Sequence, residues 1–175
     1  MSRRAELLAD RIEEGAAGLA AFAENLSEEE WRVPMSLGND RRPVGTIVHH
    51  VASMYPIEVD LARTIASGQA APDVTWEVVA GINAKHASEV DGTSKAATLE
   101  LLRKNSREAA AAVRALTDEE LDRAAPLGLA YGAPVTAQFV IEDHAPRHSW
   151  HHLWRIRAAL EQASQPLQKA HAKAS

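Results

Sequence analysis

The sequence predicts an all-α fold: a four-helix bundle with a short extra helix in the connector between helices two and three. Apolar residues recur at helical spacing, and runs of β-branched residues bounded by turn residues are absent. Residues 26–34 are echoed by residues 116–126, and each copy is followed by a loop and a histidine-bearing helix that starts at proline. Two such helix hairpins bury their apolar stripes against each other in one bundle.

A chain of 175 residues, 46 % of them hydrophobic, is long enough for one core and too short to favour two. We expect residues 1–162 to form the bundle. Residues 163–175 are small, polar and interrupted by Pro166, so they are expected to form a flexible tail. His171 in this tail is predicted to have no functional role.

Composition also restricts the partners. The first residues form a charged amphipathic pattern without an apolar signal segment, and no run of about 18 apolar residues occurs. This predicts a cytoplasmic protein with no membrane partner. Lys and Arg number 19 against 24 Asp and Glu, and the net charge of -5 argues against a nucleic-acid partner.

The chain contains no cysteine. Disulfides, a protein thiolate nucleophile and cysteine-ligated zinc are therefore excluded. A transition metal would have to bind imidazole and carboxylate groups, so the histidines are the residues expected to carry the chemistry.

The first helix is predicted over residues 4–25, where Gly15 and Gly18 weaken it locally. Its apolar stripe consists of Leu8, Ile12, Ala16, Leu19, Phe22, Ala23 and Leu26. Each of the two similar segments, 26–34 and 116–126, is predicted to contain a short capped helix. Ser27 and Thr117 are the predicted caps, and the glutamate three residues later reaches back in each copy.

The second helix is predicted from Pro43, which suits a first helical position, to Gly68. Pro56 inside it predicts a kink. The connector is expected to hold a short helix over residues 76–90, closed by Asp91-Gly92.

A third main helix is predicted over residues 95–116, with inward-facing Leu99, Leu102, Ala109, Val113 and Leu116. The fourth, over residues 135–162, has large apolar residues on several sides and is expected to be the most buried of the four. Pro146 either kinks this helix or marks a late start, which would leave His144 in a loop.

His148 and His152 are one helical turn apart, so both imidazoles can reach one ion at roughly 2.0–2.1 Å. The alternative is a pair of partly buried histidines bonded to backbone or carboxylate groups. His144 and His151 share the same face of the helix. His144 is therefore a candidate to replace His152 as a ligand, to contact one of the ligand histidines, or to act in catalysis.

In the second helix, His50 lies at the margin of the apolar face, whereas His49 lies nearly opposite its centre. His50 is thus the predicted ligand, and His49 is predicted to be solvated. Glu58 lies two turns beyond His50 on a similar side. It is a candidate acceptor for a ligand histidine or a general base, and the alternative is an ordinary surface carboxylate.

Further polar and aromatic residues lie on the connector helix and on the helix that carries His148 and His152. Asn83 and His86 on the connector helix are candidate substrate contacts if that helix lies over the mouth of the bundle. Trp150 and Trp154 are interpreted as core or dimer-interface aromatics. The nearby cationic side chains are interpreted as solvated helix charges: Arg147, Arg155 and Arg157.

The sequence resembles the DinB/YfiT-like superfamily of metal-binding four-helix bundles. The resemblance rests on residues 44–52, Val-Gly-Thr-Ile-Val-His-His-Val-Ala, on residues 148–156, His-Ser-Trp-His-His-Leu-Trp-Arg-Ile, and on the Leu-Ser-Glu-Glu-Glu-Trp segment at 26–31. It implies that His50, His148 and His152 are the metal ligands, with water or substrate completing the shell. His151, a neighbour in the motif, is a candidate substrate contact.

The resemblance further implies a divalent ion, zinc or nickel, and a homodimer. Such proteins include thiol-dependent S-transferases and isomerases that use bacillithiol, mycothiol or glutathione, and others are described as metal-dependent hydrolases. A shared bundle and metal do not fix the reaction.

The leading hypothesis is a metalloenzyme whose ion activates water or a low-molecular-weight thiol for attack on a small electrophilic substrate. One alternative is a bundle that sequesters a metal or a small molecule without turnover. Another is a structural homodimer whose histidine cluster is vestigial.

Overall fold

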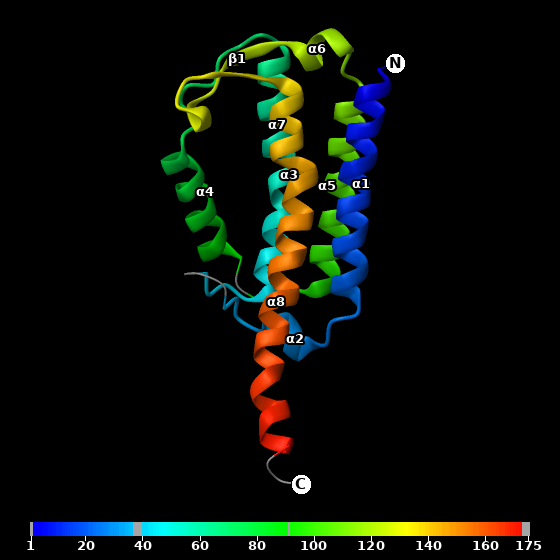
Figure 1. Cartoon of the computed structure of the whole chain (residues 1–175), viewed down its shortest axis with the longest axis vertical. Coiled ribbons are helices and arrows are strands. Elements are labelled where there is room, and N and C mark those ends of the chain that lie inside the picture. The colour runs from blue at the N-terminus through cyan, green and yellow to red at the C-terminus, as the bar shows by residue number, and fades with distance from the viewer. Residues whose placement is uncertain (1, 37–39, 91, 173–175) are drawn as a thin grey trace.

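Four long helical columns form the molecule (Figure 1). The computed structural model describes the backbone of residues 2–36, 40–90 and 92–172, and side chains as far as residue 164. The columns are α1 (Arg3–Glu24), α3 (Val44–Ala66), α5 (Lys95–Arg114), and α7 (Ala137–Asp143) continued by α8 (Ala145–Ala172). α1 packs against α5 and α8, and α3 packs against α5, α7 and α8, which closes a ring. The predicted four-helix bundle is confirmed.

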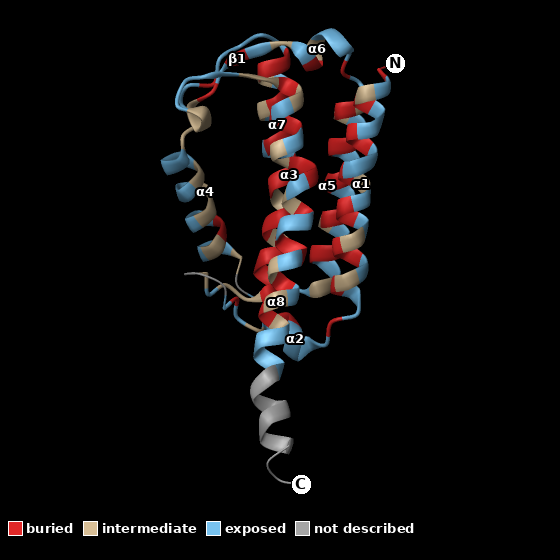
Figure 2. Ribbon diagram, in the orientation of Figure 1, coloured by how far each residue is buried: buried red, intermediate tan, exposed pale blue. Residues whose placement is uncertain are grey.

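The core lies where the four apolar stripes meet (Figure 2). The predicted stripe of α1 is buried apart from the half-buried Phe22, and so are the predicted inward positions of the third helix. The prediction that the fourth helix is the most buried is wrong. α3 is covered by α5, by α7 and α8, and by α4 (Trp76–Glu89), whereas Trp150 and Trp154 leave one side of α8 exposed.

Both predicted capping boxes are present. In α2 (Glu28–Arg32) the Glu30 N–H donates to Ser27 Oγ at 3.1 Å, and the Ser27 N–H donates to the Glu30 carboxylate at 2.7 Å. Thr117 and Glu120 repeat this arrangement in α6 (Asp118–Asp122). Each box satisfies backbone donors that the first helical turn leaves free, so the two hairpins begin in the same way.

The start of α3 is fixed by close packing between Gly45 and the indole of Trp31. A Cβ on residue 45 would lie 2.3 Å from Trp31 Nε1. We therefore expect Gly45→Ala to lower the free energy of unfolding by about 1–3 kcal/mol, because the buried indole has to move. Urea denaturation measures this change.

The matched control for that variant is Gly81→Ala in α4, where an added Cβ meets nothing within 4 Å. Alanine is the better helix former, so this substitution is expected to leave stability unchanged or to raise it slightly. Equal unfolding midpoints for the two variants would contradict the packing of Trp31 against Gly45.

Pro56 lies inside α3 without interrupting it. Because proline has no N–H, the carbonyl of Ala52 loses its helical partner. Asn105 Nδ2 on α5 donates to that oxygen at 2.8 Å. The predicted kink therefore does not break the helix. Pro43 is the residue before the first helical turn rather than the first within it, and Gly68, with φ of 84°, follows the helix end.

The fourth helix differs most from prediction. Residues 134–136 form β2 (Pro134–Thr136), which pairs antiparallel with β1 (Ala124–Pro126), and the short helix η1 (Gly128–Ala130) lies in the turn between them. The hairpin is three residues deep and has no β-branched run, so the apolar pattern does not indicate it. Helical structure begins only at α7, where Thr136 Oγ1 accepts from the Phe139 N–H at 3.1 Å.

A break at His144 separates α7 from α8. His144 has φ of −109° and ψ of −83°, outside the helical range. Pro146 cannot donate to the carbonyl four residues earlier, and its ring crowds that turn, so the helix stops and restarts. The interruption beside Pro146 is nearer to the predicted kink than to a late start, because helix α7 precedes it and His144 lies at the junction of two helices rather than in a loop.

The sequence also predicted the bounds of the connector helix and the end of the fourth helix. α4 covers nearly the expected residues and is capped by Thr75; Gly92 has φ of 73°, while Asp91 lies outside the described residues. α8 continues past the predicted end at Gln162 to Ala172. The side chain of His171 lies outside the described residues, so its lack of a role stays a prediction. Over the part of the chain described here, no helix is both long and apolar enough to cross a bilayer.

Candidate metal centre

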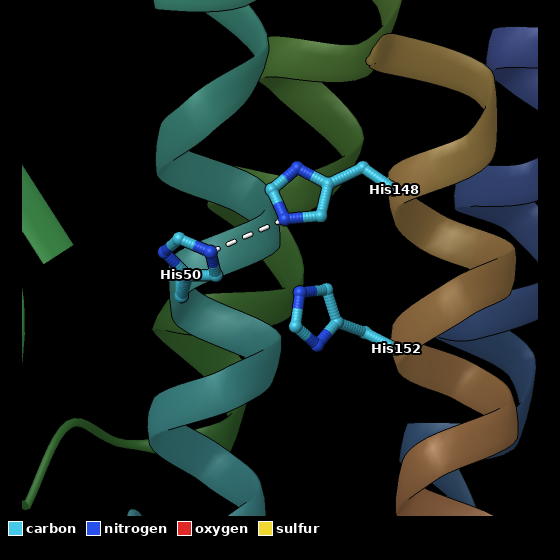
Figure 3. A group of neighbouring side chains, drawn as sticks. All are labelled: His50, His148 and His152. Atoms are coloured by element: carbon cyan, nitrogen blue, oxygen red, sulfur yellow. Dashed lines mark hydrogen bonds between the residues drawn. The ribbon is translucent and has the colours of Figure 1, made fainter. Parts of the chain in front are cut away.

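Three histidines from two antiparallel helices converge in the space between those helices (Figure 3). His50 comes from α3, and His148 and His152 come from α8. One nitrogen of each ring lies within 4.8 Å of the others. His50 Nε2 and His148 Nε2 are 3.2 Å apart, close to the spacing of about 3.3 Å that two ligands of a tetrahedral ion have at 2.0–2.1 Å. The structure thus brings together the three predicted ligands.

Burial keeps two of these rings, those of His50 and His152, neutral. His50 and His152 are only 5 % and 6 % exposed. Burial, reinforced by the neighbouring His148, lowers the pKa of His50 to about 3 and the pKa of His152 still further. A buried imidazolium would lack compensating charge, so both rings are unprotonated at neutral pH and offer lone pairs. Neutral imidazole is the form that binds a metal.

Glu58 fixes the orientation of His148. Its Oε1 lies 2.5 Å from His148 Nδ1, and the carboxylate is 9 % exposed. An Nδ1–H donated to this carboxylate leaves His148 Nε2 as the lone-pair nitrogen that faces His50. The alternative of an ordinary surface carboxylate is therefore wrong. The donor set, three imidazoles with one held by a carboxylate, fits a divalent metal ion.

A cavity of about 350 Å³ lies between α3, α4 and α8 and reaches His50, His148 and His152. His144 and His151 also line it. His144 Nδ1 contacts the Val140 carbonyl at 3.1 Å, and His144 is not part of the three-histidine group. In this structure it does not replace His152. His151 is exposed, with its ring 5.1 Å from that of His152.

α4 covers the site as the connector helix was expected to do. Asn83 lines the cavity. His86 is buried instead against α3, with its Nε2 2.9 Å from His49 Nδ1. The prediction that His49 is solvated is wrong, because α4 docks on that side of α3 and half-buries the ring between His86 and Ser53. His86 attaches the covering helix to α3 beside His50.

The rest of the cavity wall is of two kinds. One side is apolar and is lined mainly by Met54, Ile57, Leu61, Val74, Val79, Ile82 and Leu129. Arg42, Arg147 and Arg155 contribute cations. The interpretation of the α8 arginines as solvated charges holds for the exposed Arg147 but is wrong for Arg155, whose side chain is 19 % exposed and lies 3.4 Å from Asp40.

Sequence reasoning missed Asp40 and Arg42, which precede α3. The one signal available in the sequence was the run of three charged residues at 40–42, Asp-Arg-Arg, directly before Pro43. The core interpretation of the tryptophans is also wrong, because Trp150 is 45 % and Trp154 65 % exposed. Trp150 lies over Gly15 and Gly18 of α1, which explains small residues there. A dimer interface for the tryptophans stays a prediction.

Fold and site together define a helical bundle with a histidine-rich metal-binding centre. The chain belongs to the DinB superfamily, whose sequence profile matches residues 11–156.

A solved structure with a similar fold is that of YfiT from Bacillus subtilis, described as "a probable metal-dependent hydrolase with an unusual four-helix bundle topology". The two share 18 % sequence identity at a TM-score of 0.66, over 96 % of this chain and 90 % of that one. At this identity the likeness shows the shared fold. A comparison with curated proteins gives no match.

Proposed function

We propose that this protein is a metal-dependent enzyme acting on a small electrophilic substrate, either as a hydrolase or as a thiol S-transferase. His50, His148 and His152 would hold a divalent ion, zinc or nickel. When bound, the ion would supply Lewis-acid chemistry that makes water or a low-molecular-weight thiol a better nucleophile at neutral pH. The observation that carries the proposal is the convergence of three imidazoles on a covered cavity.

The protein's own residues have separable roles in this proposal. Glu58 retains the proton on His148 Nδ1 and so fixes which nitrogen faces the site. α4 covers the cavity and limits the access of water, and the His49–His86 contact keeps it docked. Asn83, His144 and His151 line the cavity where a substrate would touch them.

Turnover assays with and without thiol test the proposal. Purified protein is given an activated ester and, separately, a chloronitroaromatic electrophile, each with and without glutathione or another low-molecular-weight thiol. We expect turnover of at least one, lost on chelation and restored by zinc or nickel. Thiol dependence would assign the S-transferase, and turnover without thiol the hydrolase. Stoichiometric binding of the metal with no turnover of either probe would instead support a sequestering protein.

A further inference from the structure

The end of the cavity nearest the start of α3 carries a partly compensated pair of guanidinium groups. Asp40 accepts hydrogen bonds from Arg42 Nε and Nη2, both at 3.0 Å, and from Arg155 Nη2 at 3.4 Å. Burial alone would raise the pKa of Asp40, but the bonds from Arg42 outweigh it and the pKa is lowered. Asp40 is therefore ionised at neutral pH, and one carboxylate faces two cations.

Arg42 also has an unused donor. Its Nη1 is buried and, among the described residues, has no hydrogen-bond partner. Burying a guanidinium nitrogen without an acceptor costs desolvation free energy, because no hydrogen bond offsets the lost contact with water. Because Arg42 lines the cavity, an acceptor that enters the cavity can reach this end of it.

Elsewhere in the cavity the charged groups are engaged with neighbours: Arg147 pairs with Asp143 at 3.2 Å, and the Glu58 carboxylate bonds to His148. Among the described residues, the Asp40–Arg42–Arg155 end holds two guanidinium groups and one carboxylate.

The opposite end of the cavity is mainly apolar. Along α3 the lining residues after His50 are Met54, Ile57, Glu58 and Leu61, and the one polar member, Glu58, is bonded to His148. Leu61 lies about 16 Å along the helix axis from His50. Val79 and Ile82 of α4 face the same space. From Arg42 the cavity thus passes a histidine centre to a part whose α3 and α4 walls are mainly apolar, with Asp143, His144 and Arg147 also among its lining residues.

We propose that the ligand of this cavity is an amphipathic organic anion, with a carboxylate or similar group at Arg42 and Arg155 and an apolar body along α3 and α4. The inference deepens the proposed function and rests on it only for the position of the reacting bond beside the three histidines. A charge-assisted, two-pronged contact to a guanidinium is the chemistry that recognises such a group.

Two fluorescent probes that differ by one sulfonate group test the inference: anilinonaphthalene sulfonate and neutral phenylnaphthylamine. The wild type is expected to bind the sulfonate more tightly. Arg42→Gln is expected to weaken sulfonate binding about tenfold, because a charged hydrogen bond is lost, and to leave the neutral probe unchanged. Arg42→Lys keeps the charge and should retain most of the binding.

Arg63→Gln is the matched control, since Arg63 lies on α3 in an exposed pair with Asp60 and outside this cavity. It should change neither affinity. The preference for the sulfonate should persist in protein stripped of metal by a chelator, so the result does not depend on turnover. Equal binding of the two probes by the wild type, equal losses in Arg42→Gln, or loss of the preference on chelation would overturn the inference.

Discussion

His152→Ala is expected to lower the affinity for a divalent ion by roughly two orders of magnitude or more, because one of three ligands is removed from a site that binds only through them. His152 is 6 % exposed and projects from α8 toward His50, with ring centroids 5.4 Å apart. Competition against a metal-sensitive chromophoric chelator measures the change. Turnover, if present in the wild type, should disappear with the ion.

His151→Ala is the control for this variant. His151 adjoins His152 in the chain but is exposed and is not part of the three-histidine group. It should bind the ion as the wild type does. Added zinc or nickel should also raise the melting temperature of the wild type and of His151→Ala, but not of His152→Ala, because only a ligand of the folded state stabilises it. Full metal affinity in His152→Ala would remove this histidine from the site.

Glu58→Gln is expected to lower metal affinity or activity by about 10–100-fold, the usual effect of removing the partner of a ligand histidine. Glutamine preserves the volume, but its neutral amide holds the Nδ1 proton of His148 less firmly than the carboxylate at 2.5 Å. Metal affinity and metal-saturated kcat are measured separately. A fall in affinity alone assigns Glu58 to positioning His148, whereas a fall in saturated kcat assigns it a proton-transfer role.

Asp60→Asn on the same helix controls for loss of a carboxylate. Asp60 is exposed and pairs with Arg63. Neither metal affinity nor kcat should change in this variant. If Glu58→Gln also left both quantities unchanged, the contact between Glu58 and His148 would contribute neither to metal binding nor to catalysis.

Most of the correct predictions rest on residues that are close together in the sequence. Helical periodicity placed the long helices, and the Ser27 and Thr117 boxes were readable because capping depends on residues three apart. The pair His148 and His152 follows from helix geometry alone. His50 could be preferred over His49 because the apolar face of α3 is decided by nearby residues.

The errors lie where distant segments decide the outcome. His49 is half-buried only because α4 docks on it, and the sequence gives no position for α4. Arg155 and Asp40 are 115 residues apart in the chain, so their contact depends on how α8 passes the loop before α3. The break at His144 reflects a local competition in which Pro146 outweighs the apolar pattern around it.

A crystal structure of protein prepared without an affinity tag, with anomalous scattering recorded at the metal edges, tests the central claim most directly. It should show one divalent ion at about 2.0–2.1 Å from nitrogens of His50, His148 and His152, with Glu58 still bonded to His148. Imidazole rings turned apart, or an ion bound elsewhere while this centre stays empty in metal-containing crystals, would contradict the account.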